Sequence, residues 1–318
     1  MNNKLILYLF TAVLLGGLVS PSFALEKVKV GTSIKMAANF YLPMLAAEER
    51  GFWKENGLEV EWVPFAGGGP HSRGIAARAV NVGHTTVPDT MLWAEKGLPI
   101  IMAAEVVSSR PLLMLVKADS PYREVKDLKD KRIGVVSLGG GTHSLAQVVA
   151  AAHGIEKSVR FVATGAEPTQ LAALKVGSVD AIVISFSVGI GLKLAGDARQ
   201  VADTTDYVPK PWFDQNLYTR KDFARSEPDI LKRVVKATLQ ATAFLRANPR
   251  WTIDKIKSFQ GASEEAAKQL YEGIHWTRTG KFDRKAVENV RKFFIDYGVM
   301  TEKAPPGDEL FTTEYLPI

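Results

Sequence analysis

The segment RIGVVSLGGGTHSLAQVVAAAHG, residues 132–154, decides the fold class of this chain. Its pattern predicts a short buried strand over residues 133–136, a glycine-rich loop over residues 138–141 and a helix over residues 142–153. Glycines let backbone N–H groups converge without side chains in the way, and Thr142 is a favourable N-cap. Because a helix begins with a partial positive charge, this turn is a predicted seat for an anionic or strongly polar small molecule. A tight strand-to-helix turn without a ligand is the alternative.

The rest of the chain alternates strand and helix patterns up to about residue 200. The further predicted strands cover residues 28–32, 58–63, 100–106, 112–117, 159–162 and 181–185. The helices predicted between them cover residues 39–50, 72–79, 87–96, 168–176 and 188–195. Residues 201–218 have the composition of a connector, and long helices follow over residues 228–247, 264–273 and 284–297. This alternation predicts an α/β fold in which helices flank parallel-dominated sheets, with ligands at the carboxyl ends of the strands.

The N-terminal residues 1–24 have the features of a secretory signal peptide. Lys4 supplies a positive charge, residues 5–19 form an apolar run, and Ser22-Phe23-Ala24 is a small-x-small cleavage site. The apolar run is short for a membrane span, and a retained anchor is the alternative. We therefore expect cleavage near Ala24 and a mature protein that works outside the cytoplasm.

The composition excludes several classes of site. The chain contains no cysteine, which excludes disulfides, thiolate metal sites, a cysteine nucleophile and iron–sulfur clusters. Its 40 Lys and Arg residues against 34 Asp and Glu residues give a formal net charge of +6. Because that charge is spread thinly, without a basic run, we expect no nucleic-acid partner.

Four segments resemble periplasmic substrate-binding proteins of ABC transporters. The closest group includes binders of sulfonates, taurine, nitrate and thiamine-precursor pyrimidines. The segments are LAAEERGFWKENGLEVEWVPFAGGG (residues 45–69), VKDLKDKRIGVVSLGGGTHSLAQVVAAAHGI (125–155), LAALKVGSVDAIVIS (171–185) and ATAFLRANP (241–249). Together they cover nearly all of the predicted mature chain.

This resemblance implies a two-lobed periplasmic-binding-protein fold of type II with a hinge between the lobes. Lobe 1 is expected to comprise residues 25–110 and 214–318, and lobe 2 residues 111–213. The implied function is capture of a small solute between the lobes and delivery to an ABC permease in the inner membrane. The implied protein is a periplasmic monomer without a cofactor.

Two departures from that group fall on predicted ligand loops. The segment AVNVGHTTV, residues 79–87, lacks the acidic residue that the group usually has before the glycine, and Phe186-Ser187 stands where a proline is common. A small organic anion is our first expectation for the solute, and a pyrimidine-like heterocycle the second.

The candidate ligand-binding residues lie in the loops expected after the strands. They are Lys35, Tyr41, Gly68, His84, Thr85, Thr86, Gly140, Gly141, Thr142, His143, Ser185 and Ser187. Short hydroxyls and free backbone N–H groups suit a polar solute in a mostly apolar cavity. The same hydroxyls are also common as helix caps and turn formers, Tyr41 is also a candidate core aromatic, and Lys35 is also a candidate solvated lysine.

Histidines are prominent among the expected cleft loops. His71, His84 and His143 are three of the five histidines in the chain. They lack local ligand spacing and a supporting acidic cluster, so we expect hydrogen bonds from His84 and His143 to the ligand and no metal site.

An enzymatic function has little support in the sequence. There is no G-x-S-x-G, no H-E-x-x-H, no P-loop and no G-x-G-x-x-G after a strand. One relative of the resembling group is a pyrimidine-forming enzyme with a cysteine-rich iron motif, which a chain without cysteine lacks. We therefore expect no catalytic residues, with a periplasmic enzyme, or a PLP-associated relative that uses Lys35, as the alternative.

Overall fold

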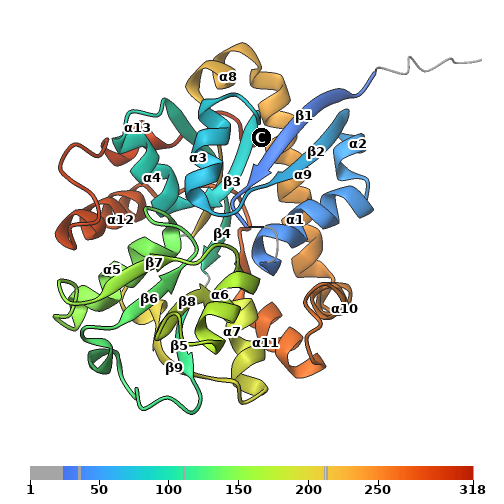
Figure 1. The fold of residues 1–318 in the computed structure, drawn as a ribbon. Helices are drawn as coiled ribbons and strands as arrows, with labels where there is room; N and C mark the ends of the chain where they lie inside the picture. Colours follow the sequence, from blue (N-terminus) through green and yellow to red (C-terminus); the bar gives the residue numbers. More distant parts are fainter. Residues whose placement is uncertain (1–23, 35–36, 110–111, 211, 213, 318) are drawn as a thin grey trace, which may run out of the picture.

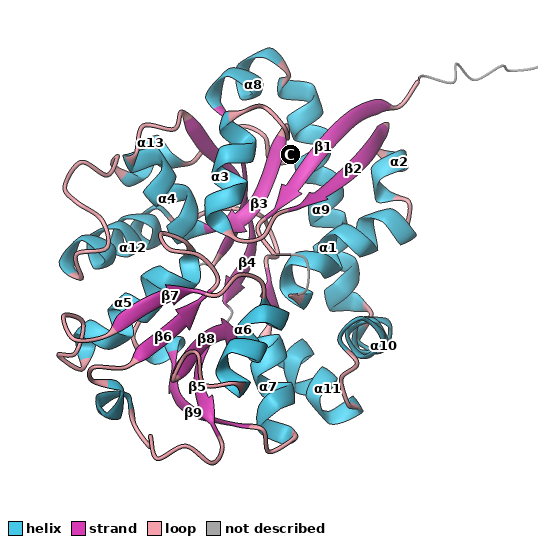
Figure 2. Ribbon diagram, viewed as in Figure 1, coloured by secondary structure: helices cyan, strands magenta, loops and turns pink. Residues whose placement is uncertain are grey.

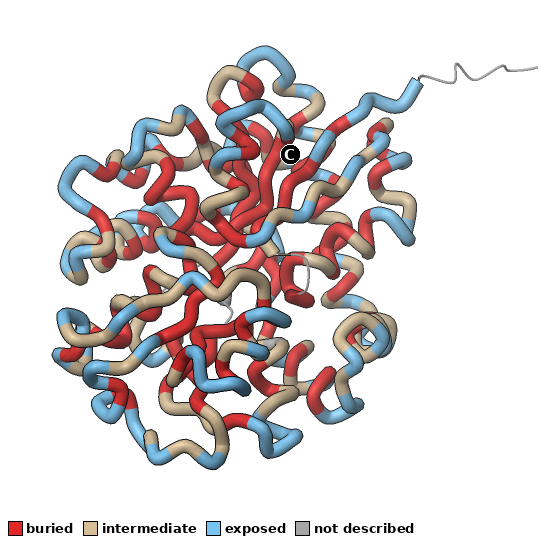
Figure 3. Tube along the Cα trace, viewed as in Figure 1, coloured by how far each residue is buried: buried red, intermediate tan, exposed pale blue. Residues whose placement is uncertain are grey.

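The protein contains two β-sheets, each flanked by helices (Figure 1). The structure is a computed structural model that describes residues 24–34, 37–109, 112–210, 212 and 214–317. The strand order is β11-β4-β10-β3-β1-β2 in the first sheet and β7-β6-β8-β5-β9 in the second. Figure 2 shows helices surrounding both sheets, and Figure 3 shows that the buried residues follow the strands and the inner helix faces.

In the first sheet, four strands run in one direction and two run in the opposite direction. Its strands are β1 (Glu26–Thr32), β2 (Leu58–Pro64), β3 (Val82–Thr86), β4 (Ile100–Ser109), β10 (Gln215–Arg220) and β11 (His275–Trp276). One core cluster joins this sheet to α1 (Ala38–Glu49), α2 (Phe52–Glu55), α8 (Lys221–Ser226), α9 (Pro228–Ala247) and α10 (Pro249–Gln260). A second cluster joins it to α3 (Gly68–Ala76), α4 (Val87–Glu95), α12 (Arg284–Asp296) and α13 (Gly307–Leu310). The two clusters lie on opposite faces of the sheet, as Leu217 of β10 belongs to the first and Tyr218 to the second.

The second sheet has its own helical layers. Its strands are β5 (Leu112–Lys117), β6 (Arg132–Val135), β7 (Arg160–Ala163), β8 (Ala181–Ser185) and β9 (Ala198–Asp203). The flanking helices are α5 (Gly141–Ala152), α6 (Glu167–Lys175) and α7 (Phe186–Leu194), with short 3-10 turns at Val125–Leu128 and Thr204–Asp206. Late in the chain, α11 (Glu264–Gly273) packs against α7, so one C-terminal helix contacts the layer of the second sheet.

Both sheets are mixed rather than parallel-dominated. The parallel pairs are β1–β2, β1–β3, β6–β7 and β6–β8. The antiparallel pairs involve β4, β5 and β10, the strands at which the chain passes from one sheet to the other. Strands β5 and β10 each enter their sheet from the direction of the other sheet. They therefore run antiparallel to β8 and β3, which point toward the other sheet, and this makes both sheets mixed.

The predicted α/β class and most elements are confirmed, with informative exceptions. Strand β8 and helices α9 and α11 have the predicted bounds. The helix predicted over residues 72–79 begins earlier, at Gly68, because the preceding Gly67 adopts φ 105° and turns the chain directly into it. The strands β3, β9, β10 and β11 and the helix α10 were not predicted, and both β9 and β10 lie partly inside the expected connector.

Within the described part of the chain, none of the helices combines the length and apolar composition needed to span a membrane.

Candidate functional site

The carboxyl ends of the parallel strands in the two sheets face each other. Strands β1, β2 and β3 end on one side of this boundary, and β6, β7 and β8 end on the other (Figure 1). The approach is close: a Cβ placed on Gly67 would lie 2.9 Å from Val136 Cγ1 and 3.0 Å from Ser137 Oγ. Loops at the carboxyl ends of strands are where open α/β sheets bind ligands.

A small cavity lies at this boundary and is called the intersheet cavity below. Its volume is about 210 Å³. Its walls are formed by Ser33, Ile34, Pro64, Phe65, Ala66, Gly67, Val136, Ala166 and Glu167. Residues of both sheets therefore line one cavity, which makes it the candidate site.

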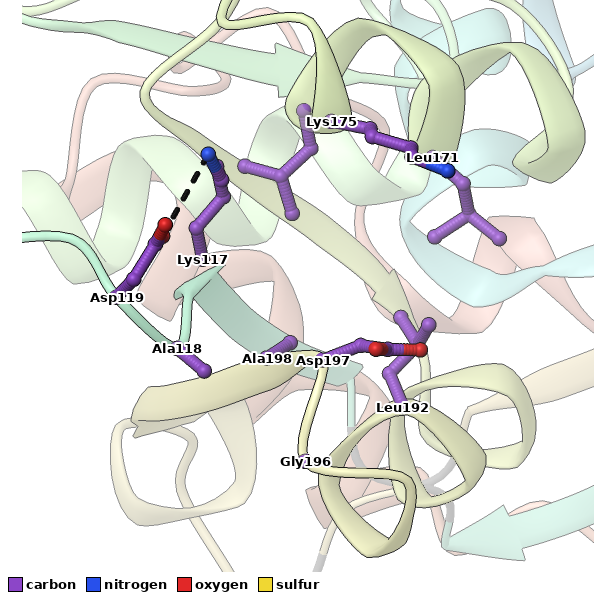
Figure 4. Close-up of a pocket in the computed structure, with 10 residues that line it drawn as sticks. Lys117, Ala118, Asp119, Leu171, Lys175, Leu192, Gly196, Asp197 and Ala198 are labelled. Carbon is purple, nitrogen blue, oxygen red and sulfur yellow. Dashed lines mark ion pairs between the residues drawn. The ribbon is translucent and has the colours of Figure 1, made fainter.

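A larger cavity of about 580 Å³ lies elsewhere on the second sheet (Figure 4). It opens between the ends of α6 and α7 and the start of β9, at the edge opposite to the carboxyl ends of β6 and β8. The Lys117–Asp119 ion pair at its rim, 3.5 Å long, is solvated. Its position away from the carboxyl ends of the parallel strands makes it a weaker candidate.

Five buried residues form a hydrogen-bonded chain behind the intersheet cavity. Tyr218 Oη lies 3.1 Å from His71 Nε2, and His71 Nδ1 lies 2.9 Å from Ser33 Oγ. Ser33 Oγ lies 2.6 Å from Thr85 Oγ1, which donates to Asp89 Oδ2 at 2.8 Å. None of these side chains is more than 2% exposed. The chain leads from the interior of the first sheet to a carboxylate that faces the second.

The Asp89 carboxylate at the end of this hydrogen-bonded series determines which atom donates in each of its hydrogen bonds. An ionised carboxylate only accepts, so Thr85 donates to Asp89 and accepts from Ser33. Ser33 then accepts from His71 Nδ1–H, and His71 Nε2 accepts from Tyr218. His71 is thus the neutral tautomer with its proton on Nδ1. Burial, reinforced by the nearby His84, lowers the pKa of His71 to about 3, in agreement with this assignment.

Asp89 lies where three helices begin. Thr86, the N-cap of α4, accepts a hydrogen bond from Asp89 N at 3.2 Å. A Cβ on Gly68, in the first turn of α3, would lie 2.7 Å from Asp89 Oδ1, and one on Gly140, the N-cap of α5, would lie 3.6 Å from it. The carboxylate of Asp89 therefore fills the position between helix starts that the sequence predicted for an anionic ligand.

The pKa of Asp89 reflects two opposing effects. Burial raises it to about 6, and hydrogen bonding with Thr85, with Thr86 and with the Gly141 N–H opposes the rise. The nearby negative charge of Asp214 adds to it.

On the second sheet, backbone geometry dominates. Helix α5 begins at Gly141, and its N-cap is Gly140, with no side-chain capping bond, so the predicted capping role of Thr142 is wrong. The Thr142 hydroxyl instead accepts from Val136 N–H at 3.1 Å, because one residue inside the helix it points back to the end of β6. His143 Nδ1 accepts from Gly139 N–H at 3.0 Å and closes the loop. Burial, and then the charge of Lys96, lower the pKa of His143.

Glu167 brings a second carboxyl group to the intersheet cavity. It lines the cavity as the first residue of α6 and hydrogen-bonds to Ser185 Oγ at the end of β8. Both residues are 2% exposed. Ser185, a predicted site residue, is therefore joined to an acid at the start of α6, where the helix dipole favours a negative charge. Ser187 follows in α7, and its side chain lies outside the description.

Several predicted site residues have different settings from those expected. His84, Thr85 and Thr86 lie in the buried strand β3 rather than in a loop, because β1 and β10 pair with this short polar segment on both sides. Tyr41 stacks on Phe259 with ring centroids 3.8 Å apart, so one face of its ring is already covered. Lys35 lies outside the described residues.

The three histidines that were expected in cleft loops lie within helices and a strand. His71 lies in α3, His84 in β3 and His143 in α5, so the expectation that all three lie in loops is wrong. In the portion of the chain that the structure describes, no group of three His, Asp or Glu residues is close enough to hold a metal ion.

The sequence did not single out Asp89 or Tyr218 as functional residues. Asp89 has a local signal, because Thr86-x-x-Asp89 matches a capping pattern at the start of a helix. Tyr218 has none, because its connection to His71 spans residues 71–218 and depends on the pairing of β10 with β3.

Comparisons with known proteins identify the family of the chain and several relatives. A family model described as NMT1/THI5 like matches residues 39–251. The chain is 24% identical over 293 residues to the taurine-binding periplasmic protein of Escherichia coli K12, covering 89% of each chain. It is 24% identical over 248 residues to a putative thiamine biosynthesis protein of Haemophilus influenzae, covering 77% of each.

A solved structure identifies the fold. A Candida albicans gene product described as exhibiting the generic periplasmic binding protein fold superposes with a TM-score of 0.80. The sequences are 18% identical, and the match covers 92% of this chain and 98% of the other. The two-sheet architecture is therefore the periplasmic-binding-protein fold, as the sequence predicted.

Proposed function

The chain belongs to the NMT1/THI5-like family, and on that premise we propose that it is the solute-binding component of an ABC importer. It captures a small polar organic solute between two lobes and delivers it to a permease in the inner membrane. The permease and its ATPase follow from the resemblance to importer binding proteins. The taurine-binding relative, which aligns with most of the chain, supports this reading.

The observation that carries the proposal is the intersheet cavity. Its walls come from loops of both sheets, Ser33 and Gly67 on one side and Val136 and Glu167 on the other. A solute held there bridges the two halves and stabilises the closed arrangement, because only that arrangement offers it both sets of contacts.

The lobes of this proposal follow the passage of the chain between sheets. Lobe 1 comprises residues 25–110 and 214–318, and lobe 2 residues 111–213. The hinge lies where β4 continues into β5 and where the chain returns from β9 to β10. Contact between α11 and α7 supplies a further connection that must adjust when the hinge moves.

Export to the periplasm is part of the proposal. Residues 1–24 have the charge, apolar run and cleavage pattern of a signal peptide. The taurine-binding relative is described as periplasmic. Mass spectrometry of the protein from the periplasmic fraction would test cleavage near Ala24.

Hydrolytic catalysis is the competing function, and Ser33 with His71 is its best case. Their side chains lie 2.9 Å apart, the separation of a nucleophile and its base. Their hydrogen bonds argue against it: His71 donates to Ser33 and so does not accept its proton. A pKa of about 3 also makes His71 a poor base at neutral pH.

Ligand-dependent closure provides the test. Thermal-shift screening of sulfonates, nitrate, carboxylates, aromatic acids and aminopyrimidines identifies ligands, because a solute that binds only the native form raises the melting temperature. Small-angle scattering with a hit at saturation should then show a smaller radius of gyration. Tight binding without compaction would contradict the hinge mechanism, and turnover of a hit would contradict a pure binding role.

A further inference from the structure

Five buried side-chain atoms at one end of the first sheet have no hydrogen-bond partner among the described residues. They are both polar atoms of the Asn39 amide, both polar atoms of the Gln215 amide, and the indole Nε1 of Trp276. Asn39 and Gln215 are fully buried, and Trp276 is 4% exposed. Because an unpaired buried polar group is costly, such groups usually meet a water molecule or a ligand. Three side chains of this kind in one region need a common explanation.

The strand register places Gln215 and Trp276 on one face of the sheet. Gln215 of β10 and Trp276 of β11 both pair with Val107 of β4, the strand between them. Residues paired across strands point to the same face, and Val107 and Trp276 belong to the core cluster that includes α1 and α9. Neighbouring strands are about 4.8 Å apart, so the two side chains start about 10 Å from each other. A single small solute is long enough to contact both.

Asn39 lies at the same end and on the same face of the sheet. It is in the first turn of α1, which follows the carboxyl end of β1. The ring of its neighbour Phe40 lies 5.0 Å from that of His84, and His84 pairs with Leu217, two residues from Gln215 along β10. The start of α1 therefore covers the part of the sheet that carries the unpaired Gln215 amide.

An aromatic side chain of the second sheet approaches the same region. Phe186, the first residue of α7, packs against the core cluster that contains Trp276. A Cβ on Gly273, three residues before Trp276, would lie 2.7 Å from Phe186 Cε1. The unpaired groups therefore lie beside the boundary between the two sheets. Asn39, Gln215 and Trp276 are called the amide–indole group below.

We propose that the amide–indole group binds the polar edge of the solute and selects solutes that carry both hydrogen-bond donors and acceptors, such as carboxamides and lactams. The proposal rests on the solute-binding function above and gives it a ligand class. The two amide oxygens require donors, whereas the amide and indole N–H groups require acceptors. Nitrate, or a sulfonate without an amine, offers only acceptor oxygens and leaves both amide oxygens unpaired. A site built to hydrogen-bond a solute rejects an analogue that lacks the matching group.

Benzamide and acetophenone test this proposal, because they share a ring and a carbonyl group but only benzamide has N–H donors. In calorimetry at pH 7.5, the mature protein should bind benzamide at least about tenfold more tightly than acetophenone or benzenesulfonate. Gln215→Leu keeps a similar volume without hydrogen-bonding groups, and it should reduce this preference by about tenfold.

The melting temperature without ligand separates this role from a structural one. Gln215→Leu should raise it, because the substitution removes a buried amide that has no partner. Gln170→Leu is the matched control, since Gln170 is also fully buried but donates to Gly134 O at 3.0 Å and to Val183 O at 2.9 Å. That variant should melt at a lower temperature and keep the preference for benzamide.

Several results would overturn the proposal. They are absence of benzamide binding, preference for acetophenone or benzenesulfonate, and a lower melting temperature in Gln215→Leu. An unchanged preference in Gln215→Leu would indicate that water rather than the solute pairs with the amide, and would also overturn it. Compaction only with a sulfonate or nitrate would overturn the ligand class and leave the solute-binding function intact, whereas compaction with no member of a broad solute panel would count against that function.

Discussion

The two sides of the intersheet cavity are built differently. The first-sheet side presents a buried chain of side chains, from Tyr218 through His71 to Asp89, in which each hydroxyl has an assigned partner. The second-sheet side presents a glycine turn and the start of α5, and its main side-chain bond joins Glu167 to Ser185. Side chains fixed by mutual hydrogen bonds set the charge of the site, whereas backbone groups set its shape. The two sides should therefore respond differently to substitution.

The largest expected effect is on the first-sheet side. His71→Ala removes a fully buried ring that packs on Phe65, leaves Tyr218 Oη without this partner and leaves Ser33 with Thr85 alone. A cavity together with unpaired polar groups should reduce the free energy of unfolding by about 3–5 kcal/mol. Urea denaturation measures this loss.

The matched control lies on the second-sheet side. His143→Ala removes a half-buried ring with one hydrogen bond to Gly139 N–H, and it should cost about 1 kcal/mol. Equal losses in the two variants would remove the distinction between a rigid side-chain network and a backbone turn.

The next effect tests the close approach of the two sides. A Cβ on Gly141 would lie 2.8 Å from Thr86 Oγ1, which belongs to the other sheet. Gly141→Ala should therefore hinder closure and weaken ligand binding by about tenfold or more, the equivalent of an overpacking cost of about 1–3 kcal/mol. Calorimetry measures the affinity and scattering the compaction.

Gly191→Ala is the corresponding control, because no neighbouring atom lies within 4 Å of the added Cβ. Its affinity should match that of the native protein. If Gly141→Ala also binds normally and closes, the tight contact between α5 and Thr86 is not required for the closed state.

The third effect concerns the pH dependence of stability. Because the pKa of Asp89 is raised to about 6, the folded protein keeps this proton between about pH 4 and pH 6, where the unfolded chain has released it. This contribution to stability is present at low pH and is lost as the pH rises through about 6. Asp89→Asn removes the cost of burying the charge and should stabilise the protein by about 2 kcal/mol at pH 7.5, with little difference at pH 4.

Urea unfolding of both proteins across pH 4–8 measures that difference. A variant that is less stable than the native protein at pH 7.5 would show that the Asp89 carboxylate is favourably placed in the absence of a ligand. In that case, burial of the Asp89 charge would not be the source of an electrostatic cost on the first-sheet side.

The smallest effect is on the second-sheet side. Thr142→Val keeps the shape of the side chain but removes the acceptor for Val136 N–H. Loss of that bond should cost about 1 kcal/mol in urea unfolding, because one buried donor is left unpaired. Thr169→Val, which loses only an exposed bond within its own helix turn, is the control and should be close to neutral. A much larger loss in Thr142→Val would indicate that this turn is as tightly constrained as the His71 network.

Much of the fold follows from local patterns. Hydrophobic period and stop signals predicted β8, α9 and α11 with their observed bounds, and alternation of elements predicted the α/β class. The missed strand β3 is short and polar, and it becomes a strand because β1 and β10 supply its hydrogen bonds and bury it. No period within residues 82–86 contains that information.

The candidate site likewise has one part that local sequence predicts and another that depends on tertiary packing. The glycine turn before α5 is visible in the chain because glycines and a helix start are adjacent in sequence. The sequence does not show that the Asp89 carboxylate lies beside that turn, because Asp89 reaches it only when α3, α4 and α5 pack with their N-termini together. Residues 68, 89 and 140 are distant along the chain, and the electrostatic surroundings of Asp89 exist only after the two sheets meet. Local sequence thus predicts where the glycine turn forms, and long-range packing sets the charge beside it, because electrostatic energy depends on distances in space rather than on spacing along the chain.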